Sequence, residues 1–128
     1  MKYFLSLALV SILFSSCSDF GTKLKYGKGE LYYTKNVTEA QASKLGTYLK
    51  EQQFFTDERK ISVQLDKSSD TFLFRMVVLD SFLNNPGYLD MARTFTGELS
   101  ENVFEKKPVV IHFCDNKLKT ERVIKPGE

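Results

Sequence analysis

The sequence has few of the residue types that build metal, redox or disulfide-stabilised sites. Its 128 residues include two cysteines, one histidine and no tryptophan. These three thiol and imidazole side chains are fewer than the four ligands of a structural zinc site. The chain also lacks a Cys-x-x-Cys pair, a glycine-rich phosphate loop and a serine elbow flanked by glycines. We therefore expect no enzyme, no metal and no cofactor.

An excess of either charge is also missing. The chain carries 18 Lys and Arg against 16 Asp and Glu, a formal net charge of +2. Because acids and bases alternate along the chain, no basic face is visible that would neutralise a row of phosphates, so nucleic acid is not an expected partner. With 42% apolar and 27% charged residues, the composition is that of a folded domain, and the length suits one domain.

The longest apolar run stands at the beginning of the chain. Lys2 is followed by twelve mostly apolar residues, Tyr3 to Phe14, and then by Ser15 and Ser16. Twelve helical residues span about 18 Å, which is short of a hydrocarbon core of about 30 Å. A positive residue, a short apolar run and small residues together predict a cleaved signal peptide over residues 1–16.

The segment Leu13-Phe-Ser-Ser-Cys17 resembles a bacterial lipobox, with Phe14 where the usual box has leucine. The resemblance implies that the Cys17 thiol receives a diacylglycerol and that cleavage makes Cys17 the N-terminus. The chain is then a lipoprotein of the cell envelope that faces the periplasm or the outside, with the outer membrane favoured in a Gram-negative cell. The alternative is an ordinary secreted protein with cysteine at this position.

The mature chain is expected to begin with a tether. Residues 17–28 comprise the lipidated cysteine and a polar stretch with two glycines and no periodicity. A flexible segment of this length reaches roughly 18 Å. Residues 29–128 are predicted to form a single α+β domain.

The expected fold is a mainly antiparallel sheet of about five strands with two helices on one face. The element order β-α-β-β-α-β-β favours a ferredoxin-like split βαβ sandwich with one added strand. The third strand is apolar on both faces and should be central. Strands are predicted over residues 30–34, 60–66, 71–79, 109–114 and 119–124, and helices over residues 38–53 and from residue 85 to a break at 107–108.

Local signals indicate where the helices begin. Thr38 and Gln41 form a capping box, and Asn85 before Pro86 has the pattern of an N-cap and first helical position. Apolar residues at helical spacing predict the buried stripes, and a glycine within the first stripe predicts close approach of that helix to the sheet. The stripes are Ala42, Leu45, Gly46 and Leu49, and then Tyr88, Ala92, Phe95, Leu99 and Val103.

Short stretches along residues 30–124 also resemble a small bacterial domain of uncharacterised function that occurs in envelope and membrane-associated proteins. Because that domain has no assigned activity, the resemblance implies no site residue. The stretches are Leu31-Tyr-Tyr-Thr34, Val37-Thr-Glu-Ala40, Leu45-Gly46, Tyr48-Leu49, Phe54-Phe55, Val63-Gln-Leu65, Phe74-Arg75 and Val77-Val78.

His112 and Cys114 are the only pair that suggests reactive chemistry. Two positions apart on a strand, they share a face, and a thiol beside an imidazole is a nucleophile–base arrangement. Side chains at this spacing lie nearly 7 Å apart, beyond hydrogen-bond reach. We therefore interpret Cys114 as a small apolar residue and His112 as a polar strand residue.

The sheet face opposite the helices is the expected interaction surface. It should present Leu73, Arg75, Val77 and Leu79 from the central strand and His112 from its neighbour, with contributions from Val110, Cys114 and Tyr32. An apolar strip of this kind often marks a protein interface. In the alternative, the neighbours of the fifth strand, the tether or the loop from Asp80 to Asn85 fold over the strip and hide it.

The function expected from these observations is a non-catalytic binding or structural module of the cell envelope. It would be anchored through Cys17 and would hold an envelope protein partner on its sheet face. Two alternatives remain open: an inhibitor or immunity-type lipoprotein that protects its owner, and a thiol-dependent enzyme that uses Cys114.

Overall fold

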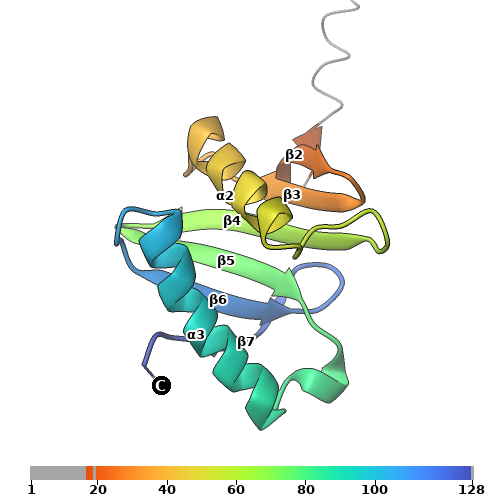
Figure 1. The fold of residues 1–128 in the computed structure, drawn as a ribbon, viewed down its shortest axis with the longest axis vertical. Coiled ribbons are helices and arrows are strands. Elements are labelled where there is room, and N and C mark those ends of the chain that lie inside the picture. Colours follow the sequence, from red (N-terminus) through yellow and green to blue (C-terminus); the bar gives the residue numbers. More distant parts are fainter. Residues whose placement is uncertain (1–16, 19, 128) are drawn as a thin grey trace, which may run out of the picture.

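The computed structural model describes residues 17, 18 and 20–127, with side chains from Phe20 onward. The predicted signal peptide, residues 1–16, lies outside the described residues. Two helices cover one face of a single sheet (Figure 1), which confirms the expected α+β class and the helices' placement on one face.

Within the described residues, seven strands form one sheet whose spatial order follows the order of the chain. Strands β3 and β4 run parallel, as do β5 and β6, and the other neighbours are antiparallel. The strands are β1 (Cys17–Ser18), β2 (Gly21–Tyr26), β3 (Gly29–Tyr33), β4 (Ile61–Ser68), β5 (Thr71–Val77), β6 (Val109–Cys114) and β7 (Thr120–Ile124). Helix α2 (Glu39–Glu51) joins β3 to β4, and η2 (Asp80–Phe82) and α3 (Pro86–Asn102) lie between β5 and β6.

The predicted split topology is wrong. In a split βαβ unit another strand lies between the two strands that a helix connects. Here β3 pairs directly with β4, and β5 pairs directly with β6. Both arrangements bury the same strand faces beneath the helices, so the hydrophobic pattern that supported the prediction does not distinguish them. The central place of β5, between β4 and β6, is confirmed.

The predicted tether is also wrong for residues 21–26, which form strand β2. This strand pairs with β3 from Thr22 opposite Tyr33 to Tyr26 opposite Gly29. Leu24 and Tyr26 are half-buried against the core, while Lys23 and Lys25 are exposed on the other face. Pairing with β3 satisfies backbone groups of an edge that would otherwise remain open, which explains why this stretch is ordered.

Helix α2 forms as its local sequence predicts. Thr38 Oγ1 accepts a hydrogen bond from the Gln41 backbone N–H at 3.1 Å, and Gln41 Oε1 accepts one from the Thr38 N–H at 2.9 Å. The predicted buried stripe of this helix is confirmed. Gly46 lies directly against the ring of Tyr26 from β2, so the expected close approach is made to an aromatic side chain of the sheet.

Helix α3 begins as predicted, and three of the five predicted stripe residues, Ala92, Leu99 and Val103, are buried. Asn85 Oδ1 accepts a hydrogen bond from the Tyr88 N–H at 2.9 Å, with Pro86 in the first turn. Leu89 and Thr96 are buried, whereas Tyr88 and Phe95 are half-buried. The buried stripe thus differs from the predicted one at two positions, and the two predicted core aromatics instead lie beside the space between the helices.

Candidate functional site

The helix-bearing side of the molecule contains an apolar groove between α2 and α3. Helix α2 lies over β2 and β3, and helix α3 lies over β6 and β7. The centre of the β2–β3 pair is four strand spacings, roughly 19 Å, from the centre of the β6–β7 pair. The helices above them are therefore separated by about twice the 8–10 Å that is usual for packed helices. The helices meet near Tyr48, whose hydroxyl accepts a hydrogen bond from Asn102 at 3.4 Å, and diverge from there (Figure 1).

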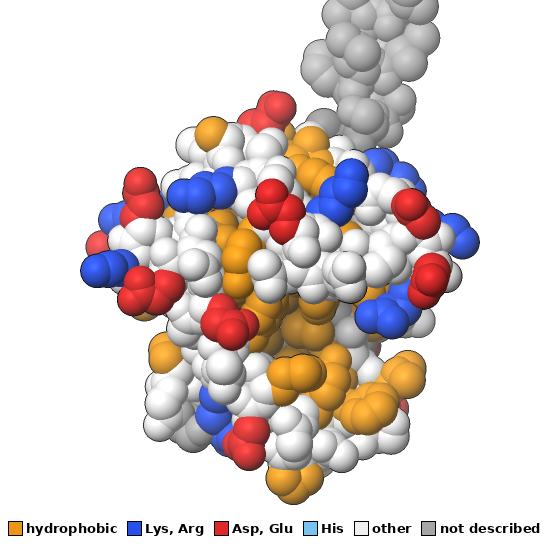
Figure 2. Space-filling model, viewed as in Figure 1, with side chains coloured by type: hydrophobic (Ala, Val, Ile, Leu, Met, Phe, Trp, Pro, Cys, Tyr) orange, Lys and Arg blue, Asp and Glu red, His pale blue; other side chains and the backbone are white. Residues whose placement is uncertain are grey.

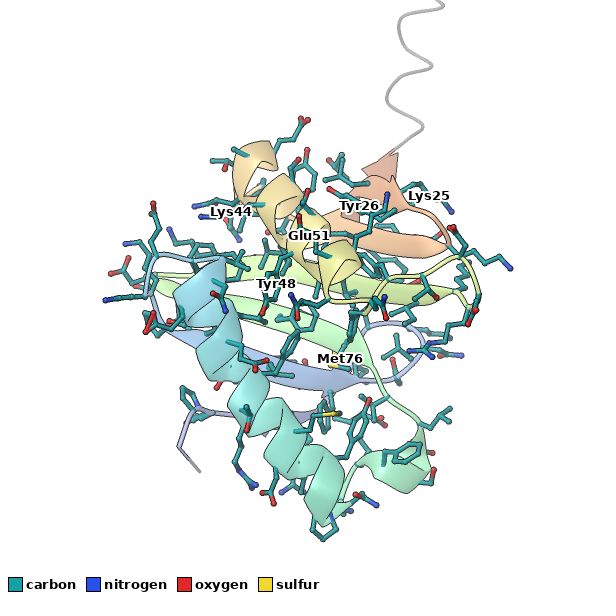
Figure 3. The ribbon with its side chains drawn as sticks, viewed as in Figure 1. Lys25, Tyr26, Lys44, Tyr48, Glu51 and Met76 are labelled. Atoms are coloured by element: carbon teal, nitrogen blue, oxygen red, sulfur yellow. The ribbon has the colours of Figure 1, made fainter. Side chains whose placement is uncertain are left out.

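The groove has a volume of about 460 Å³, within the usual range of ligand and segment-binding pockets. Figure 2 shows it as a hollow with hydrophobic side chains at its floor. In Figure 3, Tyr48 extends from α2 toward the space between the helices, and Met76 lies on the sheet below. The floor is formed by the sheet residues Met76, Ile111 and Phe113, and the walls by Tyr48, Phe54, Tyr88, Met91, Ala92 and Phe95.

Aromatic rings give the groove a firm base. Phe54, from the loop after α2, stacks on Phe95 of α3 with ring centroids 6.1 Å apart. Both rings meet Phe74 of the central strand, at 6.1 Å and 5.8 Å. Phe74 itself is fully buried. The rings therefore bridge the two helices above the central strand β5.

The rim of the groove is polar and carries both charges. Gln52, Gln53 and Arg59 line one side, and Glu98 lines the α3 side. Met91 stands at the mouth with 55% of its surface exposed. Burial raises the pKa of the Tyr88 phenol, and the nearby charge of Arg59 opposes that rise. An apolar floor with a polar, mixed-charge rim is the usual anatomy of a protein-binding surface.

The opposite sheet face, predicted as the interaction surface, is partly covered. Arg75 and His112 face each other on β5 and β6. The Arg75 guanidinium donates to the Leu118 carbonyl in the β6–β7 loop and approaches His112 Nδ1 at 3.2 Å. Thr120 Oγ1 lies 2.9 Å from the same nitrogen. The loop therefore engages the two polar residues in the middle of the face.

The surroundings of His112 favour its neutral form. Since a guanidinium only donates hydrogen bonds, its contact with Nδ1 makes that nitrogen the acceptor. Burial and the charge of Arg75 both lower the pKa of His112, and Asp66 opposes them. The hydrogen bonds and the electrostatics agree, so His112 acts as a neutral acceptor within the sheet.

Cys114 is free and fully buried. Its thiol donates a weak hydrogen bond to the His112 carbonyl at 3.5 Å. Burial raises the pKa of the Cys114 thiol above its ordinary value, although the charge of Arg75 lowers it in part. A buried thiol that remains protonated is a poor nucleophile.

The apolar members of the predicted strip are less contiguous than expected. Leu73 and Val110 are half-buried, and Val77 is 37% exposed. Strand β5 ends at Val77, so Leu79 lies beyond the sheet and is 68% exposed. The predicted strand over residues 71–79 was thus two residues too long, and Leu79 does not continue the strip.

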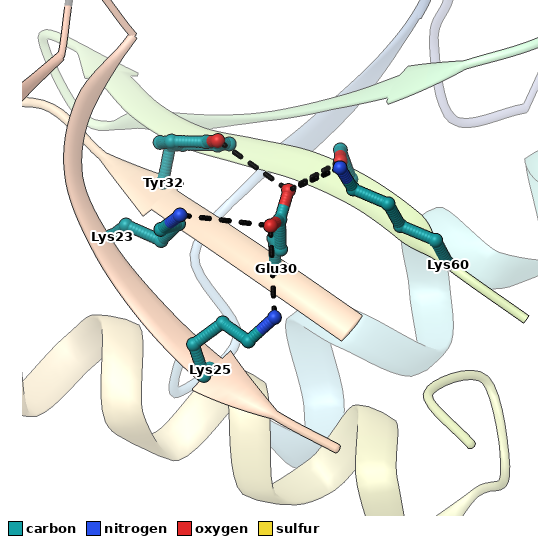
Figure 4. Close-up of polar contacts among 6 residues, drawn as sticks. Lys23, Lys25, Glu30, Tyr32 and Lys60 are labelled. Atoms are coloured by element: carbon teal, nitrogen blue, oxygen red, sulfur yellow. Dashed lines mark hydrogen bonds and ion pairs between the residues drawn. The ribbon is translucent and has the colours of Figure 1, made fainter. Parts of the chain in front are cut away.

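The same face carries a charged cluster that the sequence analysis missed. The side chain of Glu30 on β3 is 8% exposed, and the ammonium groups of Lys23, Lys25 and Lys60 lie 3.6 Å, 3.7 Å and 3.7 Å from its carboxylate. Ser62 donates to it at 3.0 Å, and the Tyr32 hydroxyl lies 3.4 Å away (Figure 4). In the sequence, the alternation of Lys23 and Lys25 with Leu24 and Tyr26 was the pattern that indicates strand β2.

The surroundings of Glu30 keep it ionised. Burial alone would raise the pKa of this carboxyl group, but the Ser62 hydrogen bond and the charges of the three lysines outweigh it and lower the pKa. Burial and the nearby Glu30 carboxylate raise the pKa of Tyr32. The cluster is therefore a buried anion beneath three exposed cations.

The described part of the chain contains no candidate metal site and no candidate membrane-spanning helix. Among these residues, no group of three or more His, Cys, Asp or Glu side chains is placed to hold a metal ion. In the same part of the chain, no helix has the length and apolar character needed to cross a bilayer.

The fold and groove define a small α+β domain in which two adjacent βαβ units share one sheet. The model of the AF_1994_N family, described as a family N-terminal domain, matches residues 23–125. The chain therefore belongs to this family, and the match includes most of β2. No curated protein and no solved structure matches the chain.

Proposed function

We propose that the chain is an exported lipoprotein, anchored to a membrane of the cell envelope by lipid on Cys17. Its folded domain would be a non-catalytic module that binds an apolar segment of an envelope protein. The observation that carries the binding role is the open aromatic groove between α2 and α3, lined by side chains such as Met91 and Tyr88.

The composition of the groove supports a protein ligand. Aromatic residues and methionine are enriched where protein partners bind, because they bury large areas and adapt to the partner's shape. The rim supplies amide and charged groups at Gln52, Gln53, Arg59 and Glu98, which can fix the orientation of a peptide. An apolar segment in contact with the floor would remove the exposed part of Met91 from water.

The reactive side chains give no comparable support for an enzyme. The Cys114 thiol is fully buried with a raised pKa. The Nδ1 atom of His112 is occupied by Arg75 and Thr120 rather than by the thiol. Both residues are therefore interpreted as structural parts of the packed sheet. This favours a binding module over a thiol-dependent enzyme.

The anchor is tested by Cys17→Ser. The wild-type chain should fractionate with membranes, and its N-terminal peptide should carry the mass of bound lipid. The variant lacks the thiol that accepts the diacylglycerol, so it should retain residues 1–16 and gain no lipid mass. Mass spectrometry of both N-terminal peptides decides the question, and a wild-type chain without lipid on Cys17 would refute the lipoprotein assignment.

The groove is tested by site-specific photo-crosslinking in intact cells. A photoreactive residue at Gln52, on the rim, should capture one defined envelope protein, whereas one at Thr94, exposed on α3 but outside the groove lining, should not. Met91→Glu puts a charge at the apolar mouth and should reduce capture about tenfold, as expected for an interface residue worth more than 1 kcal/mol.

A probe at Val77 separates the two faces of the sheet. If Val77 captures the protein and Gln52 does not, the interface lies on the face opposite the helices, and the groove is not the binding site. Capture from Gln52 that persists unchanged in the Met91→Glu background would also exclude the groove.

A further inference from the structure

The segment next to Cys17 leaves almost no free chain between the proposed anchor and the sheet. Cys17 pairs with Thr22 in the β1–β2 ladder, and Lys23 follows directly in β2. Paired Cα atoms in antiparallel strands lie about 4.5–5.5 Å apart, so the backbone of Cys17 lies within about 10 Å of that of Lys23. A lipid on Cys17 would therefore hold the edge of the sheet close to the bilayer.

The lysines beside this edge share one face of the sheet. Lys23 lies opposite Tyr32, and Lys25 lies opposite Glu30, which in turn pairs with Ser62 of β4. Lys60 approaches the same carboxylate from the start of β4 (Figure 4). The side chains of Lys23, Lys25 and Lys60 are 40%, 55% and 69% exposed, so their ammonium groups are accessible from outside.

The cluster of Glu30 with Lys23, Lys25 and Lys60 carries a net positive charge. Three ammonium groups face one carboxylate, which leaves an excess of two positive charges. Each ammonium group has three N–H donors, and its contact with Glu30 at 3.6–3.7 Å uses at most one of them. The remaining donors are available to the phosphate oxygens of lipid headgroups.

Helix α3, on the opposite side of the sheet, carries a net negative charge. Helix α3 carries Asp90, Glu98 and Glu101 against Arg93, a net charge of −2 from three acids and one base. An anionic surface would therefore attract the lysine face and repel the face that bears α3. Screening limits such forces to about 8–10 Å at physiological salt, a distance within which the proposed anchor already holds Lys23.

We propose that Lys23, Lys25 and Lys60 dock the sheet face onto the anionic phospholipid headgroups of the membrane that holds the chain. This inference rests on the proposed lipid anchor. Docking fixes the orientation of the domain, with the lysine face on the bilayer and the groove on the side away from it. The ligand is the lipid surface itself, which contributes phosphate groups to all three lysines together.

The test uses the lipidated protein in vesicles of phosphatidylcholine, with and without 30% phosphatidylglycerol. Acylation rates of individual lysines are measured by mass spectrometry. Because each lysine near an anionic surface contributes about 1 kcal/mol, Lys23, Lys25 and Lys60 should react about fivefold more slowly in the anionic vesicles. Lys44 and Lys50 on α2 should react equally in both, and high salt should restore the rates.

Protection of a lysine is its acylation rate in the neutral vesicles divided by its rate in the anionic vesicles. Two variants should change the protection of Lys60 in opposite directions. Lys23→Gln with Lys25→Gln removes two cations, and protection of Lys60 should fall toward unity. Glu30→Gln removes the inner anion and leaves all three lysines, so protection should rise above the wild-type value. Loss of folding would expose the lysines in both variants and cannot produce this pair of results.

The outcomes separate this inference from the proposed function. An N-terminal peptide without lipid refutes the anchor and the docking that rests on it. Lipid on Cys17 with equal acylation rates in both vesicles refutes the docking alone. Equal protection of Lys44 and Lys60 would also refute it, because the whole domain would then be shielded without orientation.

Discussion

Replacing Phe74 with alanine is expected to lower the free energy of unfolding by about 3–5 kcal/mol. Phe74 is fully buried on the central strand, and the rings of Phe54 and Phe95 rest on it at 6.1 Å and 5.8 Å. Removing the ring takes away its burial and leaves a cavity beneath both neighbours. Since domains of this size have total stabilities of about 5–15 kcal/mol, the variant should lose a large share.

Urea unfolding followed by circular dichroism measures the loss, with the slope of the transition compared between variants. The control is Phe82→Ala, since Phe82 is 39% exposed and its ring contacts that of Tyr88 at 5.1 Å. That change should lower stability by about 1 kcal/mol or less. Similar losses for the two variants would show that Phe74 does not support the sheet centre as described.

Gly46→Ala is expected to destabilise the domain by about 1–2 kcal/mol, although alanine normally stabilises a helix relative to glycine by about 1 kcal/mol. A Cβ atom at residue 46 would lie 2.2 Å from the ring of Tyr26. That ring cannot retreat freely, because it stacks on buried Phe55 with centroids 5.8 Å apart. Displacing the two rings should outweigh the gain in helix propensity.

Gly97→Ala provides the matched comparison on the other helix. No atom lies within 4 Å of a Cβ atom built at residue 97, and the position is exposed. Here the helix propensity acts alone, so the free energy of unfolding should rise by up to about 1 kcal/mol. Urea unfolding of both variants should give changes of opposite sign. A stabilising Gly46→Ala would contradict the packing of α2 on Tyr26.

Features governed by neighbouring residues were predictable from the sequence. The capping box at Thr38 and the Asn85 cap involve groups three residues apart, so the sequence alone specifies them. Strand pairing joins residues far apart along the chain, and either topology hides the same apolar faces. Strand β2 is an intermediate case. Its alternation of Lys23 and Lys25 with Leu24 and Tyr26 is visible in the sequence, but the flanking glycines favoured a tether.

The groove was not predictable for a physical reason. Tyr88 and Phe95 count as apolar whether they face the core or the mouth of a groove, so periodicity placed them in the buried stripe of α3. The groove arises from the separation of the helices, which depends on which strands each helix covers. The charged cluster around Glu30 was unpredictable for a similar reason, because it depends on strand pairing. Lys60 lies far along the chain from Lys23 and comes near it only through the β3–β4 pairing.

The matching order of strands along the chain and across the sheet bears on how the protein acquires its structure. Each new strand pairs with the one made just before it, so the sheet can grow from its first edge as the chain emerges. The most separated neighbouring strands, β3 with β4 and β5 with β6, have one helix between them in the chain, and no partner has to be inserted between finished neighbours. Pairing each strand with its neighbour along the chain avoids contacts of still longer sequence separation, which slow folding. Under the proposed export, a polypeptide threaded through a translocon in the unfolded state would assemble progressively on arrival, with little time for its apolar strands to meet other chains.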